Sequence, residues 1–230
     1  MNVYEAFFNS IEKKILSDLP VLDSMRSKRK LKEDNSYVTE ADFYIQEIII
    51  DAISMLDQNI TLVSEEIKAD LEQINLTQPV VVIDPLDGTE NFTSGLPEWG
   101  VGMSIFDNFQ HKASCILLPE LNKKLMTGQR VVSFNSRING LSSSLSKDGL
   151  STLSNDNEYR IMGCSMYNLY NVIKGSYLSY KNIGEVNSWD ILPGINLALE
   201  HNLSVEVNEE TYAGQFLQPD QKYSVKVFRR

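Results

Sequence analysis

Residues 80–92, which read VVVIDPLDGTENF, constrain the fold more than any other part of the chain. The first four residues, 80–83, are β-branched and apolar, a composition typical of a short buried strand. Pro85 then fixes φ and lacks the N–H that a strand would use, while Gly88 permits backbone conformations closed to other residues. The chain is therefore predicted to turn directly behind a strand and to carry two carboxylates at the turn.

Two carboxylates at a turn have two interpretations. Asp and Gly dominate turns for local reasons, so Asp84 and Asp87 could be ordinary turn residues. They also offer hard oxygen ligands to a cation such as Mg²⁺, and the amides of Gly88 and Thr89 could bind a phosphate at a helix start. Other segments favour the second interpretation because each places an acid at the end of an element: 62–66, which reads LVSEE, and 187–194, which reads NSWDILPG.

The composition predicts a soluble globular protein. Of the 230 residues, 42% are hydrophobic, enough for a substantial core in one large domain or two small ones. The formal net charge of −10 argues against nucleic acid polymers as partners, since phosphate backbones attract basic surfaces. No apolar stretch has the length of a membrane span, and the N-terminus shows no signal-peptide pattern. We therefore expect a cytoplasmic protein with no membrane partner.

Periodicity predicts the elements that surround these motifs. Helices are expected at 4–19, 41–56, 166–173 and 189–200, and strands at 60–63, 80–83, 95–106, 113–118, 125–127, 160–162 and 177–179. Thr39 and Asp42 have the spacing of a capping box at the start of the second helix. The polar segment 67–78 is expected to be a mobile helix or loop, and 133–156, rich in Ser, Asn and Gly, is expected to separate two halves.

Single residues outside the acidic motifs are given structural interpretations. Cys115 and Cys164 are expected to be reduced and structural, because they lie in apolar or small-residue surroundings and match no zinc-ligand spacing. The basic segment 26–32 begins with Arg26, which is predicted to lie in a solvated turn.

The motifs together resemble the inositol monophosphatase superfamily, which comprises Mg²⁺-dependent, lithium-sensitive phosphomonoesterases and includes the 3′(2′),5′-bisphosphate nucleotidases. The family pattern D-P-[LI]-D-G-T-x-N-F matches 84–92 at every specified position, and its W-D pair matches 189–190. The pair at 65–66 and the V-T-x-x-D segment at 38–42 follow in the same order, and the resemblance covers about 2–207. It implies an α+β fold, a layered αβαβα sandwich of the sugar phosphatase type. The half 1–140 would carry most metal ligands, and 141–230 would complete one compact catalytic unit.

The resemblance also implies a metal site. Two or three Mg²⁺ ions would bind, Mn²⁺ could replace them, and Li⁺ and Ca²⁺ would inhibit. The residues that would hold the metals are Glu65, Asp84, Asp87, Asp190 and, through its main-chain carbonyl, Leu86, with Asp84 bridging the two principal ions. The residues given catalytic roles are Glu65, Asp42 and Thr89, of which the last two would orient the attacking water. Lys32, within KEDNSYVTEAD, would face this site.

Substrate contacts follow from the same resemblance. They would come from Asp87, Gly88, Thr89, Gly163, Cys164, Ser165 and Asp190. The segment 163–165, which reads GCS, matches a family loop that wraps the substrate. Another family position, an acid that binds sugar hydroxyls, could correspond to Asn182, Ile183 or Glu185.

The expected reaction is hydrolysis of a small phosphate monoester, inositol monophosphate or a related sugar phosphate, by a metal-activated water. A 3′(2′),5′-bisphosphate nucleotidase is the alternative within the family. The alternative from another class is a regulatory or binding protein that keeps the fold while catalysis is vestigial. The expected partner is a small phosphorylated metabolite, and the resemblance allows a homodimer.

Overall fold

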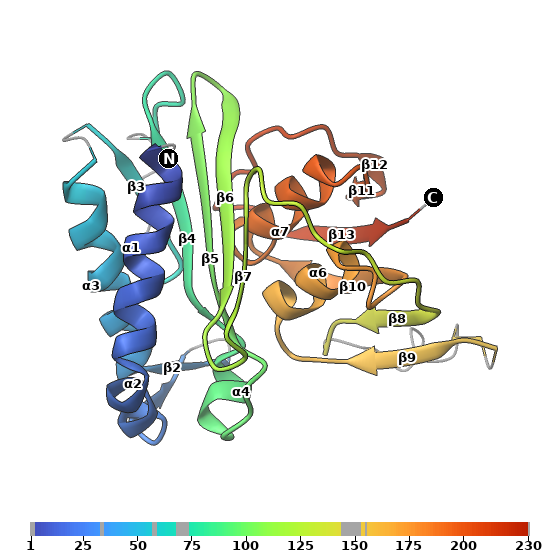
Figure 1. The fold of residues 1–230 in the computed structure, drawn as a ribbon, viewed down its shortest axis with the longest axis horizontal. Helices are drawn as coiled ribbons and strands as arrows, with labels where there is room; N and C mark the ends of the chain where they lie inside the picture. Colours follow the sequence, from blue (N-terminus) through green and yellow to red (C-terminus); the bar gives the residue numbers. More distant parts are fainter. Residues whose placement is uncertain are drawn as a thin grey trace.

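The protein is described by a computed structural model that covers residues 3–32, 35–56, 59–67, 74–143, 153–154 and 156–229, without the side chains of Ile183 and Glu185. Its elements stack in layers (Figure 1): helices, a five-stranded sheet, a second layer of helices and a six-stranded sheet. The predicted α+β sandwich is confirmed. Of the five layers of the αβαβα arrangement, the described elements supply four, and none of the described helices covers the outer face of the six-stranded sheet.

The outer helical layer contains α1 (Val3–Ser17), α2 (Leu19–Met25) and α3 (Glu40–Ser54). The predicted first helix, 4–19, is confirmed as α1, and α2, which has a proline in its first turn, is a separate helix that was not predicted. The predicted capping box is confirmed: the Asp42 carboxylate accepts the main-chain N–H of Thr39, and the Thr39 hydroxyl caps the start of α3. A small antiparallel pair, β1 (Arg29–Leu31) and β2 (Tyr37–Thr39), precedes α3 and was not predicted.

The five-stranded sheet has the order β3-β4-β5-β6-β7. Its strands are β3 (Thr61–Ser64), β4 (Val80–Asp87), β5 (Gly100–Asp107), β6 (Gln110–Leu118) and β7 (Lys123–Met126). The strands β3 and β4 are parallel, and the β5-β6-β7 pairing is antiparallel as predicted. The strand β4 is longer than predicted because it passes Pro85 through an irregularity between Asp84 and Asp87, where a missing N–H costs little. The turn comes only at Gly88.

The inner helices are α6 (Ser165–Ile173) and α7 (Ser188–Glu200), which lie between the two sheets. The six-stranded sheet has the order β12-β11-β13-β10-β8-β9. Its strands are β8 (Ile138–Leu141), β9 (Glu158–Ile161), β10 (Ser179–Val186), β11 (Ser204–Val207), β12 (Glu210–Thr211) and β13 (Tyr223–Phe228). Only β9 and the start of β10 were predicted. The division into halves 1–140 and 141–230 stays a prediction. So does the expected mobile helix or loop at 67–78, because residues 68–73 lie outside the described part of the chain.

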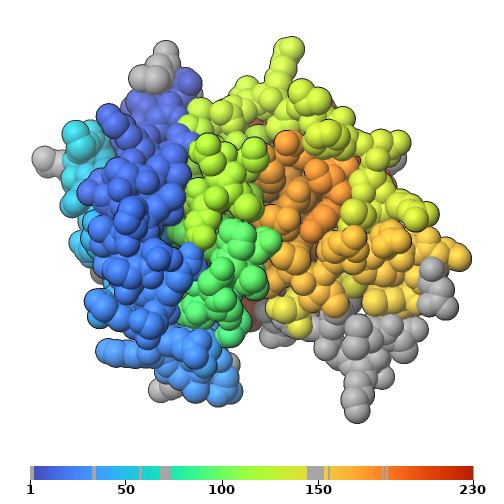
Figure 2. All heavy atoms as spheres, turned by 60° about the horizontal axis from the view of Figure 1, so that its bottom comes forward, coloured from blue at the N-terminus to red at the C-terminus, as the bar shows by residue number. Residues whose placement is uncertain are grey.

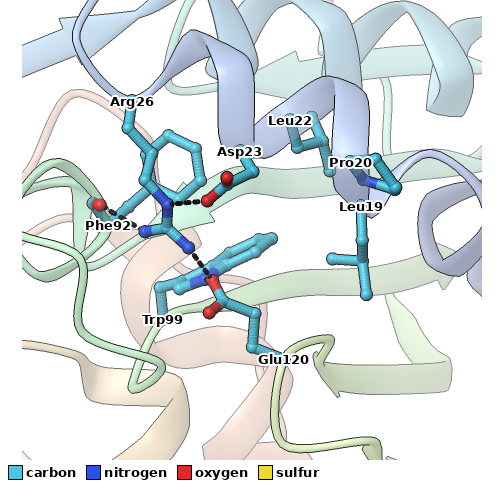
Figure 3. A pocket seen from close by; sticks show the side chains of 8 residues that line it. All are labelled: Leu19, Pro20, Leu22, Asp23, Arg26, Phe92, Trp99 and Glu120. Carbon is cyan, nitrogen blue, oxygen red and sulfur yellow. Dashed lines mark hydrogen bonds and ion pairs between the residues drawn. The ribbon is translucent and has the colours of Figure 1, made fainter.

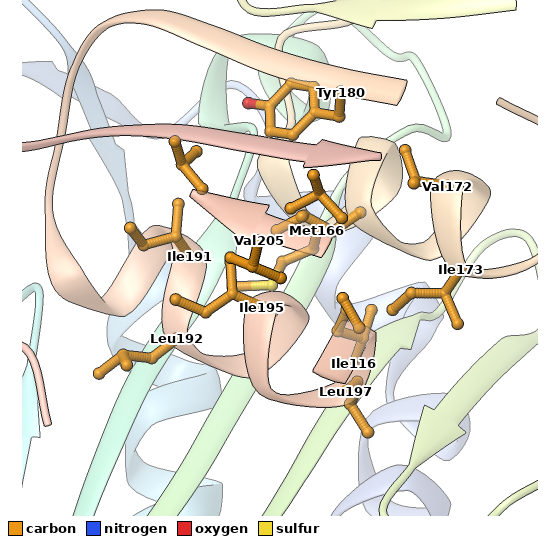
Figure 4. Packing of buried hydrophobic residues seen from close by; sticks show 14 of the residues in the cluster. Ile116, Met166, Val172, Ile173, Tyr180, Ile191, Leu192, Ile195, Leu197 and Val205 are labelled. Carbon is orange, nitrogen blue, oxygen red and sulfur yellow. The ribbon is translucent and has the colours of Figure 1, made fainter. Parts of the chain in front are cut away.

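Two hydrophobic clusters hold the layers together. One joins α1 and α3 to the five-stranded sheet, where Phe8 and Ile49 are buried with Val81. The other fills the space between the sheets, and Figure 4 shows Ile195 of α7 beside Val205 of β11. Because α7 packs against both sheets, its first turn is fixed relative to the C-terminal end of β4. Among the described residues, no helix has the length and apolar character to cross a membrane.

Candidate active site

Three acids from three elements converge at the C-terminal end of β4. Glu65 follows β3, Asp84 lies in β4, and the parallel pairing of these strands brings their C-terminal ends to one edge of the sheet. Asp190 comes from the first turn of α7. One carboxylate oxygen from each of the three lies within 4.8 Å of the others. In Figure 1 this end of β4 lies beside α4 (Thr89–Thr93) and β2. Figure 2 turns this end of the molecule toward the viewer and shows the N-terminal part (blue), the central part (green) and the later part of the chain (yellow and orange) side by side.

Asp84 is the most deeply buried of these acids. Its side chain is fully buried, and its Oδ1 accepts the main-chain N–H of Leu86 at 3.1 Å. Its Oδ2 has no hydrogen-bond partner, which is costly for a buried carboxylate. Burial, and then the nearby charges of Glu65, Asp87 and Asp190, raise the pKa of Asp84 well above its ordinary value. A divalent cation would remove this cost, and an all-carboxylate donor set suits Mg²⁺.

Asp87 and Asp190 each have one oxygen held by the main chain. Oδ2 of Asp87 accepts the N–H of Met166 at 2.5 Å, and Oδ2 of Asp190 accepts the N–H of Asn187 at 2.8 Å. Burial is the principal cause that raises the pKa of Asp87 to about 7 and that of Asp190 to about 8. Asp87 is not among the three acids whose oxygens lie within 4.8 Å, although its charge acts on both Asp84 and Asp190.

Lys32 is turned toward this cluster, as expected. Its Nζ lies 2.8 Å from Oε1 of Glu65 and 2.8 Å from Oε1 of Glu66. Burial alone would lower the pKa of Lys32, but the two carboxylates raise it above the ordinary value. Burial raises the pKa of Glu66 to about 7 in spite of the lysine, so one positive charge only partly offsets the acids around it. The lysine therefore reduces the repulsion within the cluster without removing it.

The predicted pair of Thr89 and Asp42 is brought together from positions 47 residues apart. The Thr89 hydroxyl lies 3.4 Å from Oδ1 of Asp42 and 3.1 Å from the main-chain oxygen of Leu86. Oδ2 of Asp42 is occupied by the main-chain N–H and the hydroxyl of Thr39. Burial raises the pKa of Asp42 to about 6, against the opposing effect of these Thr39 hydrogen bonds. At neutral pH the carboxylate is therefore mostly ionised and can accept the Thr89 hydrogen.

The two predicted substrate segments are in contact. Gly88 has φ of 87°, and a Cβ there would lie 2.9 Å from Cβ of Cys164 and 3.3 Å from the oxygen of Gly163. Only glycine allows this approach. Ser165 lies 3.2 Å from the Tyr180 hydroxyl, oxygen to oxygen. Cys164 as a whole is only 2% exposed, whereas Gly163 is partly exposed, and the role of the loop 163–165 in substrate binding stays a prediction.

Asn182, Ile183 and Glu185 are the three candidates for the position that binds sugar hydroxyls, and the structure describes the side chain of the first. Asn182 is 3% exposed, and its Oδ1 accepts the main-chain N–H of Gly184 at 2.9 Å, so this side chain is committed to the interior. The side chains of Ile183 and Glu185 lie outside the described part of the chain.

The expectation for Cys115 and Cys164 is confirmed in one respect, because both thiols are free and buried. The contact of Cys164 with Asp87, at 3.2 Å, was missed.

Arg26 lies in a turn, as predicted, but the expectation that its side chain is solvated is wrong. Its side chain is 17% exposed, and its guanidinium donates to the main-chain oxygen of Phe92 and forms ion pairs with Asp23 and Glu120 (Figure 3). It also lies 4.5 Å above the centre of the Phe92 ring. Because Phe92 belongs to α4, this arginine fastens the short helix that follows Gly88. A basic run in the sequence gives no signal of partners so distant.

Comparisons with known proteins agree with this geometry. Residues 4–153 match the Inositol monophosphatase family. A 3′(2′),5′-bisphosphate nucleotidase CysQ from Aggregatibacter actinomycetemcomitans is 31% identical over 93 residues, 40% of this chain and 35% of the relative. The Nus factor SuhB of Pasteurella multocida is 43% identical over 75 residues, 33% of this chain and 27% of the relative. These alignments span only about a third of the curated relatives.

Solved structures share the fold over the whole chain. An IMPase/NADP phosphatase complexed with Mg²⁺ and phosphate superposes with a TM-score of 0.82 at 18% identity, covering 99% of this chain and 90% of the other. A staphylococcal inositol monophosphatase-1 soaked in LiCl also gives 0.82 at 18% identity, covering 100% and 92%. At these identities the likeness concerns the fold alone. The family match over well more than half of the sequence establishes that the chain belongs to the inositol monophosphatase family.

Proposed function

We propose that this protein catalyses the Mg²⁺-dependent hydrolysis of a small phosphate monoester, with inositol monophosphate or a related sugar phosphate as the first candidate. The observation that carries the proposal is the unpartnered Oδ2 of Asp84 within a cluster that includes Glu65 and Asp190. A buried site of this kind has a high cost unless a cation occupies it. Family membership supports the same chemistry, and a solved structure of this fold is described as complexed with Mg²⁺ and phosphate.

The proposed metal ligands follow the positions of the acids. One ion would be held by Glu65, Asp84 and the main-chain carbonyl of Leu86, and a second by Asp84, Asp87 and Asp190. The bound ions would neutralise phosphate charge and lower the pKa of a water so that it can attack at neutral pH. The site would take two or three Mg²⁺ ions, and Mn²⁺ could replace them because it also accepts oxygen ligands.

The remaining steps belong to the protein's own residues. The single hydrogen of the Thr89 hydroxyl can go to Leu86 or to Asp42. With the Leu86 carbonyl engaged by a cation, the hydroxyl would donate to Asp42 and turn its lone pairs toward the attacking water. We propose that Gly88 and the loop 163–165 fix the phosphate, since the close contact between them leaves little freedom in either.

A bisphosphate nucleotidase is the second candidate. It is supported by the alignment with CysQ, which extends over 93 residues. A regulatory or binding role with vestigial catalysis is the candidate from another class, supported by the alignment with a relative named as a Nus factor. We propose a small phosphorylated metabolite as the partner in either enzymatic case, and a homodimer as the assembly, which light scattering would test.

The decisive experiment is a panel of phosphate-release assays. Inositol 1-phosphate, a 3′,5′-bisphosphate nucleotide and several sugar phosphates are each incubated with the protein, with and without Mg²⁺. Further arms add Li⁺ or Ca²⁺, both expected to inhibit. Fastest release from a monoester supports the first candidate, and fastest release from the bisphosphate supports the second. No release from any substrate would contradict both and leave the regulatory role.

A further inference from the structure

The first turn of α6 donates two hydrogen bonds to one oxygen of Asp87. The main-chain N–H of Met166 lies 2.5 Å from Oδ2 of Asp87, and Sγ of Cys164 lies 3.2 Å from the same oxygen. The cysteine is 77 positions from the aspartate, so the contact joins the C-terminal end of β4 to the second half of the chain. With Oδ2 so held, the orientation of the Asp87 carboxylate is tied to the start of α6.

The Cys164 thiol has a second partner, which fixes its direction. Cys164 is the N-cap residue of α6, and its Sγ accepts the main-chain N–H of Tyr167 at 3.3 Å. Ser, Thr, Asp and Asn are the residues favoured at this position, so helix capping alone does not account for a cysteine. The thiol accepts from α6 and donates to Asp87, a combination that Ser could reproduce and Ala could not.

The neighbouring residues enclose the Cys164 thiol and restrict its movement. Its side chain is 2% exposed, and a Cβ on Gly88 would come within 2.9 Å of its own Cβ. The thiol is therefore enclosed between α6 and the loop that follows Asp87. Within the same cluster, the orphaned Oδ2 of Asp84 independently marks the place that a cation would fill.

We propose that Cys164 is a positioning residue that fixes the Asp87 carboxylate for metal binding by donating its S–H to Oδ2. The inference rests on the proposed function, because it concerns the metal that this function requires. Groups that hydrogen-bond a metal ligand typically affect metal affinity by about 10–100-fold. In this role the Cys164 thiol acts through the Asp87 carboxylate and does not itself bind the metal.

The test compares three variants by Mn²⁺ binding, measured by electron paramagnetic resonance without substrate. Cys164→Ala is expected to raise the Mn²⁺ dissociation constant about tenfold or more, and Cys164→Ser to restore it. Cys115→Ala is the matched control, because Cys115 is an equally buried thiol in β6 that lies in the other hydrophobic cluster. The Mg²⁺ concentration for half-maximal activity should shift in parallel.

The outcomes separate the inference from the proposed function. If the wild-type protein binds no Mn²⁺, the proposed function is wrong. If the wild type binds Mn²⁺ and Cys164→Ala binds it equally well, the positioning role is wrong and the proposed function stands. A loss of affinity that Cys164→Ser does not restore would also overturn the hydrogen-bonding role.

A measurement that leaves Cys164 unchanged covers the case in which Cys164→Ala does not fold. The chain has two cysteines, so Cys115→Ala retains a single S–H group, whose infrared stretch reports the Cys164 hydrogen bond. We expect a band lowered by a carboxylate acceptor and shifted when Mn²⁺ is added. A band at the frequency of a free thiol, or one insensitive to metal, would overturn the inference.

Discussion

The hydroxyl of Thr89 lies 3.4 Å from the carboxylate of Asp42, which joins the start of α4 to the start of α3. Asp42 is 1% exposed, and its other oxygen is already held by Thr39. One carboxylate oxygen is thus left for the threonine, and the threonine's lone pairs are left for water. This arrangement has the form of a proton-relay pair, and it can be tested without disturbing the acidic cluster.

Thr89→Val should lower kcat by about 100-fold or more, because the hydroxyl that orients water is lost while the side-chain shape is kept. Thr89→Ser should retain most activity. Thr93→Val is the matched control, since the exposed Thr93 hydroxyl bonds only the main-chain oxygen of Glu90 in the same helix. Steady-state kinetics at saturating Mg²⁺ measures all three. Equal losses in Thr89→Val and Thr93→Val would show that α4 was damaged and that no specific hydroxyl was involved.

Asp87→Asn should abolish turnover while the fold remains intact. The amide oxygen of Asn can still accept from Met166 and Cys164, so packing at the start of α6 is preserved. Removing one negative charge from a cluster of buried acids should leave the melting temperature in EDTA at pH 8 equal to or above that of the wild type. Calorimetry and phosphate release measure the two effects. An active Asp87→Asn enzyme would remove this residue from the metal site.

The metal-free protein should lose stability as pH rises from about 5 to about 8, between the ordinary pKa values of these acids and their raised values in the folded protein. The pKa values of Glu66 and Asp87 are raised to about 7 and that of Asp190 to about 8, so the folded protein binds more protons than the unfolded chain below these values. Stability from a raised acid pKa is present at low pH and is lost as pH passes the folded value. His111, whose pKa burial lowers from 6.5, acts in the opposite direction in the part of this window below pH 6.5.

Melting temperatures in EDTA and in Mg²⁺ across this window check the prediction. The difference between the melting temperatures in Mg²⁺ and in EDTA should grow as pH rises. Mg²⁺ binds the ionised acids, whose mutual repulsion destabilises the metal-free protein. A melting temperature in EDTA that stayed level or rose from pH 5 to 8 would contradict the high pKa values assigned to the cluster.

Lys32→Gln should destabilise the metal-free protein by about 1–3 kcal/mol, since it leaves Glu66, whose side chain is 5% exposed, without its cation. Lys28→Gln is the control: the pair of Lys28 with Glu40 is more than half exposed on both sides and should contribute at most about 1 kcal/mol. Urea unfolding in EDTA compares the two variants. Equal effects would show that Lys32 does not compensate the acids of the site.

Local signals in the sequence predicted the parts of this protein that local physics determines. Thr39 and Asp42 specify the start of α3 by themselves, and the apolar run before Asp84 specifies β4. Beyond the nearby Asp23, Arg26 bonds to Phe92 and Glu120, which lie 66 and 94 positions away, and Cys164 and Asp87 are 77 positions apart. Such contacts form only when the layers pack together, and no periodicity or spacing in the sequence predicts them. The strands after α7 were also not predicted, although β13 alternates buried with partly buried residues, which is the local pattern of a strand.

The catalytic metal site is tested most directly by calorimetric titration of the metal-free protein with Mg²⁺. The titration is paired with an assay of phosphate release from inositol 1-phosphate, and both are carried out on the wild type and on Asp84→Asn. The account predicts that the wild type binds Mg²⁺ and releases phosphate only in its presence. Asp84→Asn replaces the negatively charged carboxylate that carries the unpartnered oxygen with a neutral amide. This variant should remain folded but should neither bind Mg²⁺ nor release phosphate. Mg²⁺ binding or turnover in Asp84→Asn equal to that of the wild type would contradict the central claim that this acidic cluster is a catalytic metal site.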